Sequence, residues 1–210
     1  MKSRSIPVVL SILFCLFAAP AVSAMGSLPT GPSESGNESE LSSSGGPTDM
    51  VTARVRLLPD REFQAVLEQE ISAARSEVVL TLHLFTAMEE ASRRAREMAE
   101  VLAETAKRGV KVIVVVEIGK EVSPVTQANR KTARFLSERG VQVYSDMSGT
   151  VVHAKVAVID RRLVFIGSHD LTQQSLGHYR EASIVVDSTT LATSVLGFVE
   201  SLEPVKYRDP

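Results

Sequence analysis

Apolar and polar positions along residues 50–210 follow two periods, one of about 3.6 residues that indicates helices and one of two residues that indicates strands. Between Arg61 and Arg75 the apolar side chains recur three and four residues apart, which predicts a helix. Residues 110–117 form a nearly continuous apolar run, typical of a central strand that is covered on both faces. By the same criteria we expect helices over 88–108, 127–138 and 191–202, and strands over 77–85, 141–144, 151–159, 163–167 and 182–186.

The order of these segments predicts the class of fold. Strands alternate with helices through most of the domain, which favours an α/β architecture with a mixed β-sheet sandwiched by helices. Only the turn residues 160–162 separate the strands 151–159 and 163–167, so we expect these two strands to form a hairpin. No internal repeat is visible in the sequence.

The N-terminal segment follows neither period. Lys2 and Arg4 precede an apolar run over 6–19, and small residues lead to Ala24, where a signal peptidase can cleave. We therefore predict a signal peptide over 1–24 and a periplasmic or secreted protein. The alternative, an uncleaved membrane anchor, also implies export.

Residues 25–49 are rich in Ser, Gly and Pro and contain no apolar periodicity, so we predict a disordered linker. That leaves 50–210 as one folded domain, with 21 Lys and Arg residues against 21 Asp and Glu residues. This balance lacks the overall basic footprint that nucleic-acid binding usually leaves. A local basic patch stays open, with the candidates Arg93, Arg94, Arg96, Lys107, Arg108, Arg130, Lys131 and Arg134.

The chain offers little for thiol or metal chemistry. Its one cysteine, Cys15, lies in the predicted signal peptide, so the mature chain would have no disulfide and no reactive thiol. The four histidines are scattered without the spacing of metal ligands, so we expect neither a metal nor another cofactor.

The segment from His153 to Asp160 fits the pattern H-x-K-x-x-x-x-D and carries the most informative polar residues. On the predicted strand, His153 and Lys155 would project side by side, because residues two apart share a face. An imidazole beside a fixed ammonium suits chemistry on a phosphate. The ammonium balances the charge of the oxygens while the imidazole attacks or donates a proton.

Two further features follow this motif, namely Gly167-Ser168-His169-Asp170 and, downstream, Glu181. Together they resemble the signature of the phospholipase D superfamily, in which H-x-K-x-x-x-x-D is followed by G-S-x-N and then a Glu. The resemblance covers about residues 51–204 and is greatest to the small Nuc-type endonucleases, which carry one motif per chain. It implies a phospholipase D-like fold with one such motif per chain, and a catalytic domain over 50–210.

The resemblance implies a mechanism with two histidines, one attacking phosphorus to form a phosphohistidine and one protonating the leaving oxygen. This chain has a single H-x-K, so the second half-site would come from another copy in a two-fold homodimer. His153 is then the nucleophile, Lys155 balances charge, and Ser168 donates to a phosphate oxygen. Glu181 is expected to accept a hydrogen bond from the imidazole. Asp160 is grouped with the catalytic residues, although a purely structural role at its turn stays open.

One position departs from the family pattern. Asp170 stands where the signature has Asn, and an ionised Asp is negative and can only accept hydrogen bonds. It would repel a phosphodiester unless it is protonated or paired with Lys155, Arg180 or His169. We keep Asp170 among the phosphate-binding residues and expect it to tune substrate choice, activity or the pH optimum. Of the other histidines, His169 is expected at the rim of the site, His83 is interpreted as structural, and His178 as exposed.

The leading hypothesis is an exported, metal-independent phosphodiesterase that acts as a nuclease on DNA or RNA. A first alternative is a phospholipase D or phosphatidyl-transfer enzyme, which would use the same residues on a phospholipid. The absence of Trp and the few other aromatic residues count against the membrane-seeking surface that it needs. A second alternative is a non-catalytic domain that binds nucleic acid or an envelope partner, which the joint presence of His153, Lys155, Ser168 and Glu181 disfavours.

Overall fold

The computed structural model describes residues 50, 52–119, 123–145 and 150–208. All of them lie in the compact unit Gly45–Pro210. The predicted signal peptide and linker lie outside the described residues and stay predictions. Among the residues that are described, no helix is long and apolar enough to cross a membrane.

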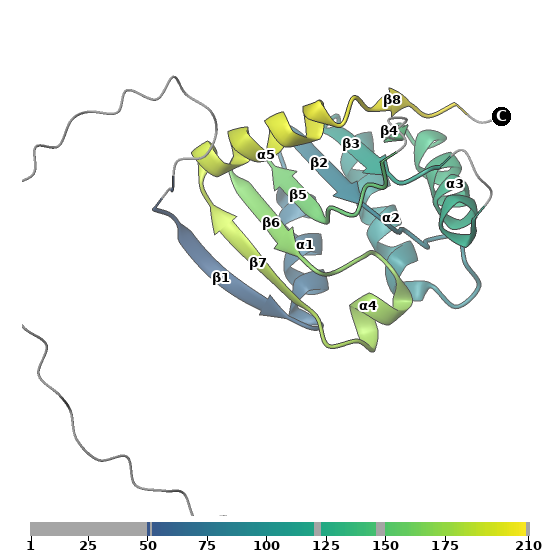
Figure 1. Cartoon of the computed structure of the whole chain (residues 1–210), viewed down its shortest axis with the longest axis horizontal. Helices are drawn as coiled ribbons and strands as arrows, with labels where there is room; N and C mark the ends of the chain where they lie inside the picture. Colours follow the sequence, from purple (N-terminus) through teal and green to yellow (C-terminus); the bar gives the residue numbers. More distant parts are fainter. Residues whose placement is uncertain (1–49, 51, 120–122, 146–149, 209–210) are drawn as a thin grey trace, which may run out of the picture. The chain divides into compact units, whose positions relative to one another are not determined.

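The centre of the described chain is an eight-stranded sheet. Its strands are β1 Arg54–Pro59, β2 Glu77–Leu82, β3 Lys111–Val116, β4 Gln142–Ser145, β5 Val156–Ile159, β6 Leu163–Gly167, β7 Ala182–Asp187 and β8 Val205–Lys206. They lie in the order β1-β7-β6-β5-β2-β3-β4-β8 (Figure 1). The neighbours β2, β3 and β4 run parallel and all other neighbours pair antiparallel, so the predicted mixed sheet is confirmed.

Helices cover both faces of this sheet (Figure 1). They are α1 Glu62–Ala73, α2 Arg93–Lys107, α3 Pro124–Ser137, α4 Gln173–Gly177 and α5 Thr189–Ser201. Strand β3 shows the two layers: Val114 belongs to the core cluster that contains residues of α1, α2 and α3, whereas Val115 belongs to the cluster that contains Val199 of α5. Burial on both sides explains the continuous apolar run of this strand and confirms its predicted central place.

Several element boundaries differ from those that the sequence predicts. The helix expected over 88–108 begins only at Arg93, because a turn precedes it. In this turn the hydroxyl groups of Thr86 and Ser92 form a hydrogen bond (3.0 Å). The strand expected over 151–159 begins only at Val156. The sequence pattern does not predict the short elements β1, α4 and β8, and β1 is an edge strand with four exposed residues at its start, so its burial pattern is weak.

One edge of the sheet gathers the segments that matter for chemistry. Strand register aligns Thr81 near the end of β2 with Val156 at the start of β5, and then with Ile166 and Ile184 in β6 and β7. The loops that leave β2 and β6 and those that enter β5 and β7 therefore meet at this edge. Residues far apart in the sequence become neighbours there.

Candidate active site

The motif residues His153 and Lys155 lie just before β5 and not on it, which corrects the predicted strand geometry. They are nevertheless close together, because the Lys155 side chain folds back over its neighbour. Its Nζ donates to the His153 carbonyl oxygen (3.0 Å) and lies 3.4 Å from each nitrogen of the His153 ring. The His153 ring is exposed, whereas the Lys155 side chain is only 8% exposed. The structure thus presents an exposed imidazole beside a largely buried ammonium.

Asp170, the residue that departs from the family pattern, sits beside that ammonium. Its Oδ2 lies 3.6 Å from Lys155 Nζ, and its Oδ1 accepts the backbone N–H of Leu84 (3.0 Å). Lys155 is one of the cations that the sequence analysis names as possible partners for this carboxylate. Pairing removes most of the repulsion that a lone carboxylate would exert on a phosphate, but it also offsets the charge of the ammonium.

Ser168 and Glu181 form a second polar cluster at the same edge. The Glu181 carboxylate accepts hydrogen bonds from Ser168 Oγ and from Ser175 Oγ (2.8 Å). Asp60 holds Glu181 in place, because its Oδ1 accepts the Glu181 backbone N–H (2.9 Å). In the described part of the chain Glu181 makes no hydrogen bond to His153, so the contact expected from the sequence does not occur within one copy.

The glycine of the Gly-Ser pair has a steric reason. Strand β6 approaches β7 so closely at Gly167 that an added Cβ would lie 2.4 Å from the Ser183 Cα. No other residue type fits without moving β7. The close approach brings Ser168, which follows Gly167, within reach of Glu181 at the start of β7.

The sequence groups Asp160 with the catalytic residues, but the structure places it at the opposite end of β5 from His153. Its carboxylate accepts the backbone N–H groups of Arg75 (3.0 Å), Ser76 (2.8 Å) and Glu77 (3.1 Å). Burial alone would raise the pKa of this carboxyl, but these hydrogen bonds outweigh burial and leave its pKa below the usual value. Asp160 therefore joins the start of β2 to the end of β5, which is the structural role that the sequence leaves open.

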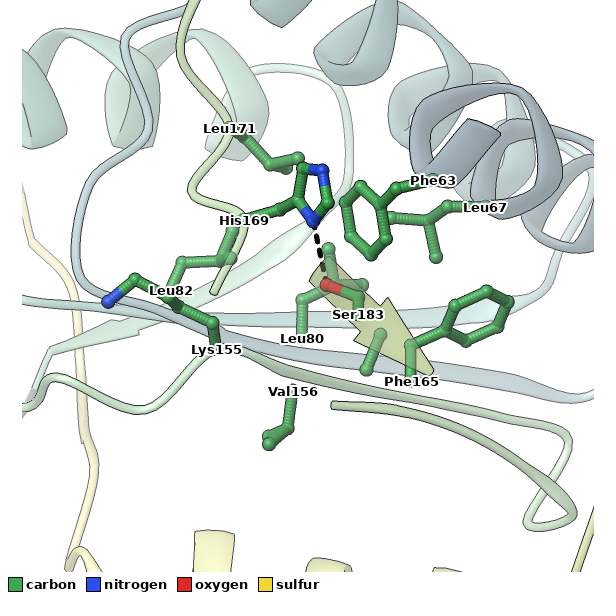
Figure 2. A pocket seen from close by; sticks show the side chains of 11 residues that line it. Phe63, Leu67, Leu80, Leu82, Lys155, Val156, Phe165, His169, Leu171 and Ser183 are labelled. Atoms are coloured by element: carbon green, nitrogen blue, oxygen red, sulfur yellow. Dashed lines mark hydrogen bonds between the residues drawn. The ribbon is translucent and has the colours of Figure 1, made fainter. Parts of the chain in front are cut away.

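The sequence predicts His169 at the rim, and this expectation is wrong, because the side chain is only 1% exposed. Its ring stacks on Phe63 (centroids 4.2 Å apart) and its Nε2 donates to the Asp60 carbonyl (2.9 Å). Its Nδ1 therefore accepts from Ser183 Oγ (2.7 Å), the dashed bond in Figure 2. Burial lowers the pKa of His169, against smaller opposing effects of Asp60 and Glu181.

The cavity in Figure 2 is lined in part by Phe63, His169 and Ser183, and its volume is only about 10 Å³. Lys155, His169 and Ser183 are the polar residues among lining residues that are otherwise apolar. This volume corresponds to roughly one water molecule, so the cavity is a packing gap and not a substrate pocket.

A larger groove opens beside His153 on the surface. It has a volume of about 280 Å³ and is mainly apolar. Val151 is 61% exposed and Phe198 of α5 is 46% exposed in its wall. The lining residues are Thr150, Val151, Val152, His153, Ala154, Phe198, Ser201, Leu202 and Glu203. The groove gives the imidazole an apolar neighbourhood on one side.

Two residues that sequence reasoning missed support the same edge. Asn129 of α3 is fully buried and donates to the carbonyl oxygens of His83 (2.8 Å) and Glu117 (2.7 Å). Glu117 in turn accepts the Val152 backbone N–H (2.8 Å) through its carboxylate. A polar residue directly after the apolar strand 111–116 was the available signal for Glu117. The role of Asn129 depends on long-range contacts and has no local signal.

The other candidates from the sequence lie apart from this cluster or pair elsewhere. His178 is exposed at the end of α4, as expected. In the proposed basic patch, Arg93, Lys107 and Lys131 form ion pairs with Glu97, Glu104 and Glu89, which weakens the patch as an anion site. Among the described residues no group of three or more His, Cys, Asp or Glu side chains could hold a metal ion.

Comparison of the sequence with known families gives a match over residues 67–202 to the family described as "Cardiolipin synthase, PLD-like domain". Cardiolipin synthase A from Proteus mirabilis is 28% identical over 150 residues, which are 71% of this chain and 29% of that protein. Cardiolipin synthase A from Buchnera aphidicola is 27% identical over 126 residues, or 60% of this chain and 24% of that protein. The chain thus spans less than a third of the length of these curated relatives.

Solved structures share the fold. Nuc from Salmonella typhimurium, a phospholipase D family member, aligns with a TM-score of 0.63 and 20% identity over 75% of this chain and 100% of its own. NucT from Helicobacter pylori aligns with a TM-score of 0.59 and 20% identity over 74% of this chain and 100% of its own. These likenesses confirm the phospholipase D-like α/β fold that the sequence predicts.

Proposed function

Since this chain belongs to the phospholipase D superfamily, we propose that it is a metal-independent phosphodiesterase whose nucleophile is His153. One observation carries the proposal: an exposed imidazole stands directly beside the ammonium of Lys155 at the edge of a rigid sheet. The imidazole is free to reach a phosphorus atom, and the ammonium is fixed where charge develops on the phosphoryl oxygens.

The reaction proceeds in two displacements. A nitrogen of His153 attacks phosphorus, the bond from phosphorus to the leaving oxygen breaks, and that oxygen takes a proton from an acid. Water then attacks the phosphohistidine, the phosphorus–nitrogen bond breaks, and the water proton passes to the group that acted as acid in the first step. The products are an alcohol and a phosphate monoester, with His153 restored.

The acid in this scheme is His153 of a second copy. A two-fold homodimer would set the two imidazoles on opposite sides of one phosphate, since such an interface duplicates each residue. The exposure of His153 supports this arrangement, because a partner that covers the ring would exclude water and strengthen the electrostatic contacts at the site. In this dimer Glu181 of one copy is available to orient the imidazole of the other.

Nucleic acid is the substrate that we propose first, acted on by an exported enzyme. Support comes from the single motif, from the small domain and from the alignment with the whole of Nuc and NucT. Export rests on the predicted signal peptide over 1–24 and places the enzyme in the periplasm or outside the cell.

A phospholipid is the second candidate substrate, with phospholipase D or phosphatidyl-transfer activity. Two observations favour it: the relatives of similar sequence are named cardiolipin synthase A, and an apolar groove of about 280 Å³ opens next to His153. The acyl chain that extends from a headgroup bound at His153 could lie in such a groove. The catalytic residues are the same for both candidates.

A panel of substrates in excess EDTA separates the candidates. Purified protein is given supercoiled plasmid, single-stranded DNA, RNA, and vesicles of phosphatidylcholine or phosphatidylglycerol, with His153→Ala as control. We expect nucleic-acid cleavage that persists in EDTA and disappears in the variant. Turnover of the vesicles alone would replace the first candidate with the second. If none of the substrates is hydrolysed, the result would contradict the enzyme proposal and favour a binding domain.

A further inference from the structure

A second imidazole stands in the same half-site, and the proposed mechanism does not use it. His83 follows β2 directly, and its ring centroid lies 4.8 Å from that of His153, with the two planes tilted by 48°. Its Nδ1 lies 3.1 Å from the Val152 carbonyl oxygen. A carbonyl oxygen only accepts, so Nδ1 carries the proton of this bond. Within the described part of the chain Nε2, on the far side of the ring, makes no hydrogen bond.

The backbone around His83 is held from several sides. The buried Asn129 donates to the His83 carbonyl (2.8 Å) and accepts the Phe85 N–H (2.8 Å). Glu117 fixes the backbone of Val152, which in turn holds the His83 ring. The His83 ring is half-buried and therefore cannot move freely. A side chain held in this way loses little conformational entropy when it binds a ligand.

The charges of Lys155 and Asp170 in the half-site indicate what the His83 imidazole could contribute. Asp170 stands where the family pattern has a neutral Asn, and it offsets the ammonium of Lys155 at 3.6 Å. The segment that carries His83 also holds Asp170 in place, because Leu84, the residue after His83, donates its N–H to the Asp170 carboxylate (3.0 Å). A phosphodiester carries one negative charge, so this pair alone attracts it less than a free ammonium would.

We propose that His83 is a substrate-contacting residue that returns the positive charge which Asp170 removes. In its protonated form the Nε2–H of His83 donates to a non-bridging oxygen of the phosphodiester held at His153. Contact with the phosphate favours the protonated ring, and the proton comes from solvent. This inference rests on the proposed function only in taking a phosphodiester as the ligand at His153.

His83→Asn tests the contact, because the amide of Asn can replace the Nδ1–H donor to Val152 but has nothing in the place of Nε2. With bis(4-nitrophenyl) phosphate we expect kcat/KM to fall about 10- to 100-fold, as for loss of one charged donor at a reacting group. The loss should grow as pH falls, because only a doubly protonated imidazole can donate from Nε2 while Nδ1–H stays bonded to Val152. His178→Asn is the matched control, since His178 is exposed, and it should leave kcat/KM and the unfolding temperature unchanged.

A double-mutant cycle tests the charge compensation itself. Asp170→Asn restores the neutral residue of the family pattern, so in this background His83→Asn should cost less than about threefold. An equal loss in both backgrounds, or no loss in the wild-type background, would overturn the proposal. A lower unfolding temperature for His83→Asn with an unchanged pH profile would also overturn it, because that result marks a purely structural histidine.

Phosphate binding separates this inference from the proposed function. Inorganic phosphate is titrated into the full protein while the imidazole proton resonances are followed by NMR. We expect the His83 resonance to shift with phosphate and His83→Asn to weaken binding several-fold. If no substrate is hydrolysed but this shift occurs, the proposed enzyme activity fails and the role of His83 stands. If substrate is hydrolysed while the His83 resonance does not move, the role of His83 fails and the proposed activity stands.

Discussion

The sequence motif from His153 to Asp160 spans β5, and the residues at its two ends have opposite environments. At one end the exposed His153 ring lies against Lys155 and the His83 ring, and the Lys155 ammonium also lies close to Asp170. At the other end Asp160 accepts three backbone N–H groups and the Ser76 hydroxyl (2.8 Å). The motif spacing thus spans the strand. It separates an end that carries the proposed nucleophile, with unused hydrogen-bonding capacity, from an anchoring end whose carboxylate has most of its capacity satisfied.

A short motif can thus serve both chemistry and stability. A reactive group must keep free capacity for substrate, and such a group adds little to folding. A carboxylate that collects several N–H donors is the reverse, because it stabilises the fold and has little capacity left for a ligand. Exchanging residues at the two ends should therefore change different quantities.

The largest expected effect is at the end that carries the proposed nucleophile. His153→Ala should lower kcat by at least about a thousandfold, because the proposed mechanism has no other nucleophile. The unfolding free energy should change by less than about 0.5 kcal/mol, since the ring is exposed. Steady-state hydrolysis and urea unfolding of the same preparation measure both. Appreciable turnover by the variant would refute the assignment of the nucleophile.

The next effect is at the anchoring end. Asp160→Ala should lower the unfolding free energy by about 2 kcal/mol, because three backbone N–H groups lose their acceptor. The activity of the molecules that remain folded should stay within about threefold of wild type. Chemical denaturation gives the first quantity and hydrolysis at low temperature gives the second. A stable but inactive Asp160→Ala would restore the catalytic role that the sequence suggested for this residue.

Acid should weaken the fold through His169 and through carboxyls whose pKa folding lowers, among them Asp160 and Asp187, whose pKa the hydrogen bond from Arg162 lowers to about 2. Folding lowers the pKa of His169 through burial, and of Asp160 through its hydrogen bonds, which outweigh burial. A group whose pKa is lowered by folding contributes stability above its unfolded pKa, and this stability is lost as pH falls through the folded value. The unfolding temperature should therefore begin to fall below the ordinary pKa of 6.5 for His169, and fall again below 3.8 for Asp160. Thermal scans across pH measure this.

Two variants separate the contributions in those scans. His169→Gln should remove the upper part of the pH dependence, because glutamine does not titrate. His178→Gln is the matched control and should keep the wild-type curve, since His178 is exposed. An upper part that persists in His169→Gln would show that another group is responsible.

The smallest expected effect concerns the second copy of the chain, which supplies the other His153 in the proposed homodimer. If each site needs His153 from two copies, the activity of an exchanged mixture of wild-type protein and His153→Ala should follow the square of the wild-type fraction. An equal mixture should then retain about a quarter of full activity. Independent monomers would retain about half. The mixture is assayed after subunit exchange, and a linear dependence would contradict the shared site.

Much of the site could be predicted from sequence because its signals are local. The positions of His153, Lys155, Ser168 and Glu181 follow from short motifs whose spacing reflects one strand and one close approach at Gly167. The contacts could not be predicted with the same success. Glu181 meets Ser168 and Ser175, and His153 lies before the strand and not on it. Hydrophobic periodicity reports burial, and it does not report where a strand stops pairing.

Periodicity was enough to predict the α/β class, and the motif residues, through their resemblance to a known family, were enough to predict the family and the candidate site. Both kinds of signal lie in residues that are close together in the chain. Only the tertiary structure decided that Asp160 anchors the start of β2, that His169 is buried against Phe63, and that His83 lies beside His153. Each of these depends on contacts between segments distant in the chain. Such contacts are set by how strands and helices pack, and single-sequence patterns carry almost no information about them.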